Sequence, residues 1–260
     1  MVATQLEFYE PKAPLVMIVG NYGSGKTEVA VNVAIGLGSY NKRISIADLD
    51  IVNPYFRCRE ARALMDSHNI RVVIPPGAQQ YADLPIVLPE IKGMLRPRDE
   101  EISIFDIGGD EVGAIPLSSF VEALGDQDYS LLQVINARRP FTDTVEGCLK
   151  MKEAIEGTSR LQVTGLISNT HLIEETTPEV IVQGYELTKE VSRRTGVPVE
   201  FVTAMGDLAT SPEVCAVNVP ILKLKRIMLP PWLRTEQKQD SPREETSKIP
   251  AGRTKPIFRP

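Results

Sequence analysis

Short apolar runs alternate with longer segments of mixed hydrophobic and polar residues along most of the chain. The run at residues 15–19 is unbroken, which is typical of a strand buried on both faces of a sheet. The runs that we interpret as strands cover residues 15–19, 44–47, 71–74, 102–105, 131–135, 161–167, 199–202 and 221–224. The helical patterns cover about 28–37, 57–68, 84–95, 142–155, 178–195 and 211–216. This alternation predicts an α/β fold whose mostly parallel sheet carries helices on both faces.

Start and stop signals mark the ends of two of these helices. Pro178 occupies the first position of the helix over 178–195, and Gly196 follows its last residue. Proline at the start and glycine just past the end are common helix boundaries. Thr142 is expected to cap the helix over 142–155, because threonine hydroxyls accept hydrogen bonds from first-turn N–H groups.

The composition changes after residue 233. Residues 234–260 are polar and contain four prolines. Their seven Lys and Arg outnumber four Asp and Glu, which gives a net charge of +3. A segment with so little apolar surface cannot offset the entropy of ordering its backbone. We therefore expect an N-terminal lead-in at 1–13, a single nucleotide-binding domain at 14–233 and a disordered tail at 234–260.

Composition and charge narrow the class of protein. Apolar residues make up 42% and charged residues 24%, as in ordinary globular domains. The formal charge of −5 gives no general reason to expect a nucleic-acid partner. No apolar run approaches the roughly 20 residues of a membrane span. Residues 1–14 lack the apolar core of a signal peptide. The expectation is a cytoplasmic protein with neither nucleic acid nor a membrane as its partner.

Residues 20–27 join the first predicted strand to the first predicted helix and read G-x-x-x-x-G-K-T, the phosphate-binding loop pattern. Glycines let the backbone N–H groups form an anion-binding nest at a helix N-terminus. Lys26 is placed to reach the β- and γ-phosphates, and the Thr27 hydroxyl to ligate Mg²⁺. A glycine-rich turn without a ligand is the alternative, which the flanking strand and helix disfavour. The residues expected to contact the nucleotide here are Gly20, Asn21, Tyr22, Gly23, Ser24, Gly25, Lys26, Thr27 and Glu28.

Carboxylates follow two of the other predicted strands. Asp48 and Asp50 come after the strand at 44–47, and Asp106 comes after the strand at 102–105. In open α/β sheets this edge is where ligands bind. We expect Asp106 to hold Mg²⁺ through a metal-bound water. Asp50 is the first candidate for positioning the attacking water and Asp48 the second, with solvent-exposed strand ends as the alternative interpretation.

Together these motifs resemble those of the P-loop ATPases of the MinD/ParA and CobQ/CobB-type group, within the SIMIBI class. The resemblance covers about residues 14–230. The segment from Asp48 to Asn53 is similar to the group's switch I, and Asp106-x-x-Gly109 is similar to its switch II. The resemblance implies a P-loop NTPase three-layer sandwich with a seven- or eight-stranded sheet. It also implies that Gly109 contacts the nucleotide and that Asn169 contacts the purine base.

One position departs from the group's pattern. MinD- and ParA-like members carry a signature lysine five residues before the loop lysine, where this chain has Asn21. That lysine reaches the partner's phosphates in an ATP-sandwiched dimer, so this mode of homodimer activation is in doubt. Relatives similar to dethiobiotin and cobyrinate synthetases also lack it. The guanine-binding pattern N-K-x-D is not found, so guanine specificity has no support.

Three functional interpretations remain open. The first is a Mg-ATP-binding ATPase in which Lys26 stabilises charge on the transferring phosphoryl group and hydrolysis is coupled to a protein partner or a maturation process. The second is an ATP-dependent ligase or synthetase with a cationic second-substrate pocket. The arginines that could line such a pocket, or simply lie on the surface, are Arg57, Arg59, Arg138 and Arg139. The third is a nucleotide-switched binding protein with negligible turnover.

Overall fold

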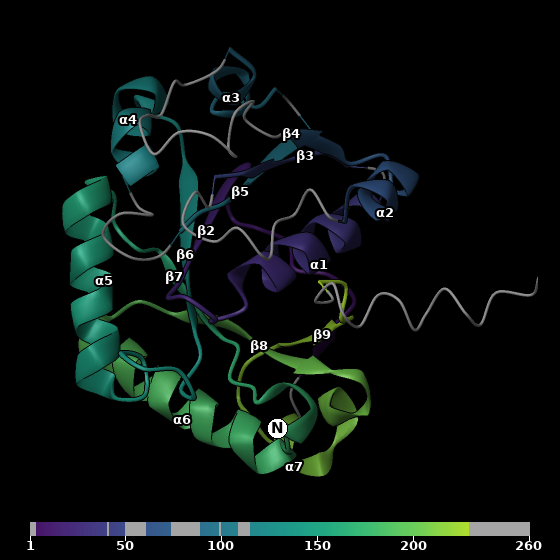
Figure 1. Cartoon of the computed structure of the whole chain (residues 1–260), viewed down its shortest axis with the longest axis vertical. Coiled ribbons are helices and arrows are strands. Elements are labelled where there is room, and N and C mark those ends of the chain that lie inside the picture. The colour runs from purple at the N-terminus through teal and green to yellow at the C-terminus, as the bar shows by residue number, and fades with distance from the viewer. Residues whose placement is uncertain are drawn as a thin grey trace, which may run out of the picture. The chain divides into compact units, whose positions relative to one another are not determined.

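A parallel sheet with helices on both faces forms the body of the protein (Figure 1). The computed structural model describes residues 4–40, 42–49, 61–73, 89–98, 100–108 and 115–228. The strands are β1 Gln5–Leu6, β2 Leu15–Val19, β3 Arg43–Asp48, β4 Arg71–Val73, β5 Glu101–Asp106, β6 Tyr129–Ile135, β7 Gly165–Ser168, β8 Val199–Met205 and β9 Ile221–Leu224. The α-helices are α1 Lys26–Gly38, α2 Arg62–Ser67, α3 Pro89–Met94, α4 Ile115–Leu124, α5 Val145–Ser159, α6 Pro178–Thr195 and α7 Pro212–Cys215.

The sheet has nine strands in the order β1-β9-β8-β7-β6-β2-β5-β3-β4. Each described pairing is parallel, from β1 with β9 to β3 with β4. Strand β2 lies centrally between β5 and β6, so the loops that follow all three strands meet at one edge. This edge is the ligand-binding side of a parallel sheet.

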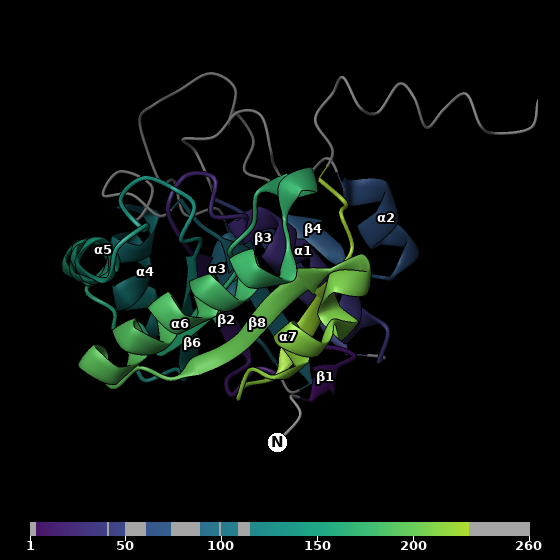
Figure 2. The same ribbon diagram turned by 90° about the horizontal axis from the view of Figure 1, so that it is seen from below.

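The core lies on both faces of the sheet. Val16 and Ile18 of β2 pack with α1 and α2, whereas Leu15, Met17 and Val19 pack with α3, α4 and α5. Figure 2 shows α1 and α2 on one side of the sheet and α4 and α5 on the other. Each fully buried aliphatic side chain contributes roughly 1.5–3 kcal/mol relative to an exposed one. Burial on both faces explains why the strands read as continuous apolar runs.

Two elements were missed by the sequence analysis. Strand β1 lies within the predicted lead-in and pairs with β9, so the sheet has nine strands rather than the seven or eight expected. Helix α4, over Ile115–Leu124, lies in a stretch where no helix was predicted.

The predicted cap of α5 was also wrong. The Thr144 hydroxyl accepts from the Gly147 N–H at 3.1 Å, while the Thr142 hydroxyl donates to the Asn136 carbonyl at 2.8 Å.

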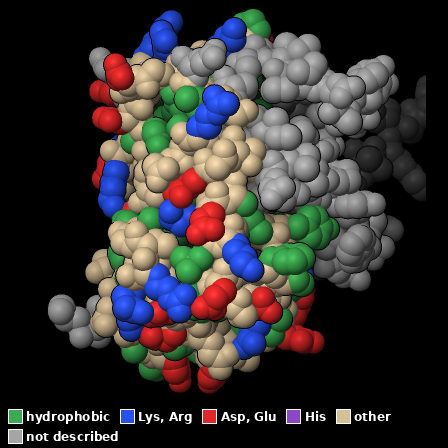
Figure 3. Space-filling model, turned by 90° about the vertical axis from the view of Figure 1, so that its left-hand side faces the viewer, with side chains coloured by type: hydrophobic (Ala, Val, Ile, Leu, Met, Phe, Trp, Pro, Cys, Tyr) green, Lys and Arg blue, Asp and Glu red, His purple; other side chains and the backbone are tan. Residues whose placement is uncertain are grey.

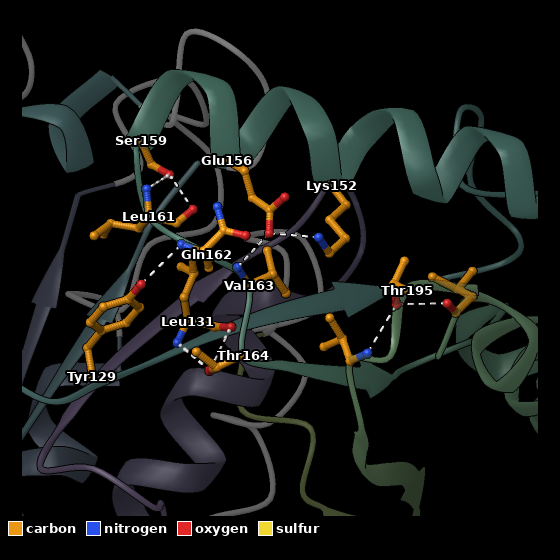
Figure 4. Close-up of polar contacts among 12 residues, drawn as sticks. Tyr129, Leu131, Lys152, Glu156, Ser159, Leu161, Gln162, Val163, Thr164 and Thr195 are labelled. Atoms are coloured by element: carbon orange, nitrogen blue, oxygen red, sulfur yellow. Dashed lines mark hydrogen bonds and ion pairs between the residues drawn. The ribbon is translucent and has the colours of Figure 1, made fainter. Parts of the chain in front are cut away.

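The strand predicted over 161–167 begins only at Gly165. Side chains hold the preceding residues in place of a continuous ladder (Figure 4). The Gln162 N–H donates to the Tyr129 hydroxyl at 3.0 Å, and the Val163 N–H donates to Glu156 at 2.9 Å. Lys152 also donates to Glu156, at 2.7 Å. These bonds satisfy backbone groups that a longer strand would otherwise have paired.

Acidic and basic side chains are interspersed on the face over α5 and α6 (Figure 3). Glu190 pairs with Arg193 at 2.7 Å, and Arg194 bridges from α6 to Glu146 of α5 at 3.0 Å. Exposed pairs of this kind contribute little to stability, because water and salt screen their charges. In the part of the chain that the structure describes, no helix is long and apolar enough to cross a membrane.

Several sequence predictions lie outside the described residues. They are those for Asp50, Asn53, Arg57, Arg59, Gly109 and the tail at 234–260. Their proposed roles stay predictions.

Candidate functional site

The loop between β2 and α1 turns sharply at its glycines. Gly23 and Gly25 have φ values of 73° and 83°, in the left-handed region that favours glycine. A Cβ added to Gly20 would lie 2.7 Å from the Val134 carbonyl oxygen, so β6 packs directly against the loop. Gly25 occupies the N-cap of α1 and supplies no side-chain cap. The first N–H groups of α1 are therefore in position to bind an anion.

Lys26 and Thr27 open α1 and are both buried, with Lys26 only 5% exposed. Most of the Lys26 residue is thus removed from bulk solvent. The Thr27 hydroxyl donates to Asp106 Oδ2 at 2.6 Å. This contact joins the end of the phosphate loop to the end of β5, and the magnesium role predicted for these two residues stays a prediction.

Two carboxylates stand next to each other at the strand ends. Asp48 of β3 and Asp106 of β5 are register partners, and both are buried. The Leu49 N–H donates to the Asp106 carbonyl oxygen at 2.8 Å, which fixes the backbone beyond β3. A hydroxyl and carboxylates are hard oxygen ligands of the kind that Mg²⁺ prefers, with nucleotide phosphates and waters as further ligands. The described residues contain no cluster of three His, Cys, Asp or Glu that would hold a metal alone.

Asn169 lies against the loop. Its Nδ2 donates to the Ser24 carbonyl oxygen at 2.6 Å, and its Oδ1 accepts from the Thr203 hydroxyl. A Cβ on Gly25 would lie 2.3 Å from Asn169 Nδ2, so this contact also requires glycine. Asn169 therefore supports the shape of the loop from β7. Its predicted contact with a purine base remains a proposal.

The turn after β6 also contacts the loop. Asn21 Nδ2 donates to the Pro140 carbonyl oxygen at 2.7 Å, and Arg139 Nε donates to the Gly23 carbonyl oxygen at 3.0 Å. Arg138 lies apart from the loop and hydrogen-bonds to Gln183 of α6. The sequence alone does not distinguish the two arginines, because adjacent positions in a turn carry no signal of which side chain faces the loop.

His171 is a half-buried residue at the rim of the site. Its ring forms part of the lining of a cavity of about 30 Å³ between the ends of β7 and β8. Burial, together with the charges of Arg139 and Arg226, lowers the pKa of His171 to about 4. The imidazole is therefore neutral at pH 7. No local sequence signal singles out this residue, because its surroundings come from segments that are far apart in the chain.

Glu28, in the first turn of α1, accepts hydrogen bonds from backbone groups of a distant segment. Its carboxylate accepts from the Ile227 N–H at 2.6 Å and the Met228 N–H at 3.0 Å, beyond the end of β9. Burial raises the pKa of Glu28, and these hydrogen bonds offset part of that rise. Asn32, one turn later, donates to the Lys225 carbonyl oxygen at 2.9 Å. Glu28 thus attaches residues 225–228 to α1, and its predicted contact with the nucleotide stays a prediction.

Solved structures of other proteins are similar to this chain in fold. No protein-family model and no curated protein matches the chain. The cell division protein FtsY from Thermotoga maritima is 18% identical with a TM-score of 0.52, and the match covers 76% of this chain and 64% of that one. FtsY from Mycoplasma mycoides is 15% identical with a TM-score of 0.47, over 77% of this chain and 63% of that one. The chain therefore spans slightly less than two thirds of these structures.

The Thermotoga structure supports the predicted fold. At this level of identity the likeness concerns the fold alone, which is the α/β sandwich of the P-loop NTPase type. The predicted P-loop NTPase type of fold is therefore confirmed, and membership of the SIMIBI class stays a proposal. The finer resemblance to the MinD/ParA and CobQ/CobB-type group remains a proposal.

Proposed function

We propose that this protein is a Mg-ATP-binding P-loop ATPase that couples nucleotide binding and hydrolysis to a partner or a maturation process. The observation that carries the proposal is the contact between Thr27, at the end of the glycine loop, and Asp106, at the end of β5. This contact brings a hydroxyl and a carboxylate beside an anion-binding nest at the start of α1. A strand-to-helix turn without a ligand does not require a buried Lys26 or a buried carboxylate at this place.

The described residues have distinct roles in this proposal. The loop N–H groups and Lys26 bind the β- and γ-phosphates and stabilise charge on the transferred group. Thr27 and Asp106 would hold Mg²⁺, which when bound neutralises phosphate charge. Asp48, the register partner of Asp106, is our second candidate for positioning the attacking water. Asp50, our first candidate for positioning the attacking water, keeps that proposed role from the sequence.

Adenine is the base that we propose, because the segment after β7 lacks the guanine-binding pattern. It reads Asn169-Thr170-His171-Leu172, which has neither the lysine nor the aspartate of N-K-x-D. The carboxylate of that pattern would accept from the guanine N–H groups, and leucine cannot. Competition between ATP and GTP for the site tests this choice directly, and preferential binding of GTP would contradict it.

The ligase alternative gains no specific support. Of its four candidate arginines, Arg138 contacts Gln183 and Arg139 contacts the phosphate loop. Arg57 and Arg59 lie outside the described residues. A nucleotide-switched protein with negligible turnover uses the same site as a slow ATPase. Phosphate release measured with and without cell extract distinguishes these two, because stimulated hydrolysis would indicate a coupled partner.

Nucleotide binding is tested by replacing Lys26. We expect Lys26→Ala to weaken binding of Mg-ATP and Mg-ADP by at least about tenfold, because the variant removes a charge-assisted contact with the phosphates. Lys150→Ala, on the exposed surface of α5, is the matched control and should bind as the wild type does. Isothermal titration calorimetry gives both affinities. Equal ATP binding by the wild type and Lys26→Ala would contradict the proposed site.

A further inference from the structure

The turn between β6 and α5 is held in a fixed shape. The Thr142 hydroxyl and the Arg139 N–H donate to the Asn136 carbonyl oxygen at 2.8 and 3.1 Å. The Ala137 N–H donates to the Thr170 hydroxyl at 3.0 Å, which ties the turn to the segment after β7. These hydrogen bonds hold the backbone of the turn and thereby limit the directions that its side chains can take.

The guanidinium of Arg139 lies against the phosphate loop. Its Nε donates to the Gly23 carbonyl oxygen at 3.0 Å. A Cβ on Gly23 would lie 2.9 Å from Arg139 Nε and 3.1 Å from Cζ, so the missing side chain makes this approach possible. The neighbouring contact from Asn21 to the Pro140 carbonyl oxygen, at 2.7 Å, holds the turn and the loop together at a second point.

The charge of Arg139 is partly removed from water. The residue is half-buried, and within the described parts of the chain no ion pair joins it to an acidic side chain. A half-buried cation gains stability when an anion approaches, because its field is screened less than at an open surface. The loop beside it is the nest expected to hold a polyphosphate. Position 21, five residues before Lys26, carries a neutral amide.

We propose that Arg139 is a nucleotide-binding residue whose positive charge acts, within the same chain, on the phosphates held by the loop at 20–27. This inference rests on the proposed nucleotide-binding function and adds a cation from outside the loop motif. Arg139 supplies positive charge from the turn after β6, whereas Asn21, within the loop, supplies none. Its neighbour Arg138 has no such role, because it extends to Gln183 of α6.

Three substitutions separate charge from packing. Arg139→Gln retains an N–H donor for the Gly23 carbonyl oxygen but removes the charge, Arg139→Lys retains the charge, and Arg139→Ala removes both. We expect Gln and Ala to weaken binding of Mg-ADP by about tenfold, as for one charge-assisted contact, and Lys to stay within about threefold of the wild type. Arg138→Ala is the matched control and should bind as the wild type does. Calorimetry at two salt concentrations should show a weaker salt dependence for Arg139→Gln.

The possible outcomes distinguish a failure of the charge role of Arg139 from a failure of the proposed function. Wild-type affinity in Arg139→Gln, with binding that still depends on Lys26, would overturn the role of Arg139 and leave the proposed function intact. Weak binding by Arg139→Ala alone, with Gln normal, would likewise overturn the charge role and assign Arg139 to packing. A wild-type protein that binds neither ADP nor ATP would overturn the proposed function and this inference together. Thermal melting of each variant confirms that it is folded.

Discussion

The hydroxyl of Thr27 and the carboxylate of Asp106 belong to different elements and meet at 2.6 Å inside the protein. Asp106 has no exposed surface. Burying a carboxylate is costly unless hydrogen bonds and nearby positive charge compensate. At the scale of single residues, the proposed function accounts for this cost, because it needs negative charge beside the phosphate loop.

Replacing Asp106 with asparagine tests this interpretation. Asp106→Asn keeps the shape of the side chain and an oxygen for the Thr27 hydroxyl, but removes the charge that would attract Mg²⁺. We expect Mg²⁺ to strengthen ATP binding in the wild type and to have little effect in Asp106→Asn. Asp126→Asn, at an exposed position, serves as the control. Calorimetry with and without Mg²⁺ is the measurement, and an unchanged Mg²⁺ effect in Asp106→Asn would contradict the metal role.

His171 should make the stability of the protein depend on pH. Its folded-state pKa of about 4 lies below the ordinary value of 6.5, so the unfolded chain binds the proton more tightly. Its contribution is fully present above pH 6.5 and is lost as the pH falls towards 4. Between pH 7 and pH 5 the free energy of unfolding should drop by about 2 kcal/mol from this group.

Urea denaturation at the two pH values measures this effect. His171→Gln, which does not titrate in this range, should lose about 2 kcal/mol less than the wild type between pH 7 and pH 5. The comparison cancels the contributions of carboxylates common to both proteins. Equal losses in both proteins would show that His171 is not held neutral by the fold.

At the scale of elements, α6 packs closely on the segment that follows β7. A Cβ on Gly184, in the middle of α6, would lie 2.0 Å from the Thr170 hydroxyl oxygen. That hydroxyl accepts from the Ala137 N–H, so α6 supports the turn that carries Arg139. The helix can approach this closely only because glycine has no side chain there.

Two glycines in helix interiors should respond in opposite directions. Gly184→Ala should lower the free energy of unfolding by about 1–3 kcal/mol, because the added methyl group forces Thr170 to move. Gly157→Ala in α5 is the matched control, since nothing lies within 4 Å of its added Cβ. It should raise the free energy of unfolding by roughly 0.5–1 kcal/mol through helix propensity alone. Thermal or urea unfolding of both variants checks the signs, and a stabilised Gly184→Ala would contradict the packing argument.

The elements that the sequence predicted well carry local signals at both ends. Helix α6 was predicted with its observed bounds, because Pro178 begins it and Gly196 ends it in the left-handed conformation. Strand β1 was missed because two residues are too short to show a pattern, and only pairing with β9 makes them a strand. Thr142 was wrongly chosen over Thr144 because both can act as caps, and tertiary contacts decide between them.

The candidate site likewise has parts that were predictable from the sequence and parts that were not. The loop at 20–27 was predictable because its chemistry is local in sequence. The placing of Asp106 beside this loop was predictable from the shared edge of parallel strands, but its direct contact with Thr27 was not predicted. The contacts of Asn169 with Ser24 and of Arg139 with Gly23 were not predictable, because each depends on how a separate turn folds over the loop.

At the scale of the whole molecule, the question is whether a second copy of the chain can take part in the site. Asn21 stands where MinD- and ParA-like members carry the signature lysine. Its side chain is turned into its own chain, donating to the Pro140 carbonyl oxygen at 2.7 Å and accepting from the Tyr22 N–H at 2.7 Å. The residue is buried, at 8% exposure. It therefore fixes the loop within one subunit.

We expect the mass of the protein in solution to be the same with ADP as with ATP under non-hydrolysing conditions. A neutral, inward-facing Asn21 cannot place a cation on the phosphates of a second subunit, whereas the contacts that we propose between loop and nucleotide are all local to one chain. Any dimer should therefore form independently of nucleotide, or be weaker than in relatives with the signature lysine. Light scattering with each nucleotide is the measurement. A monomer with ADP that becomes a tight dimer only with ATP would show that another residue replaces the lysine, and Arg57 and Arg59 would be the first to test.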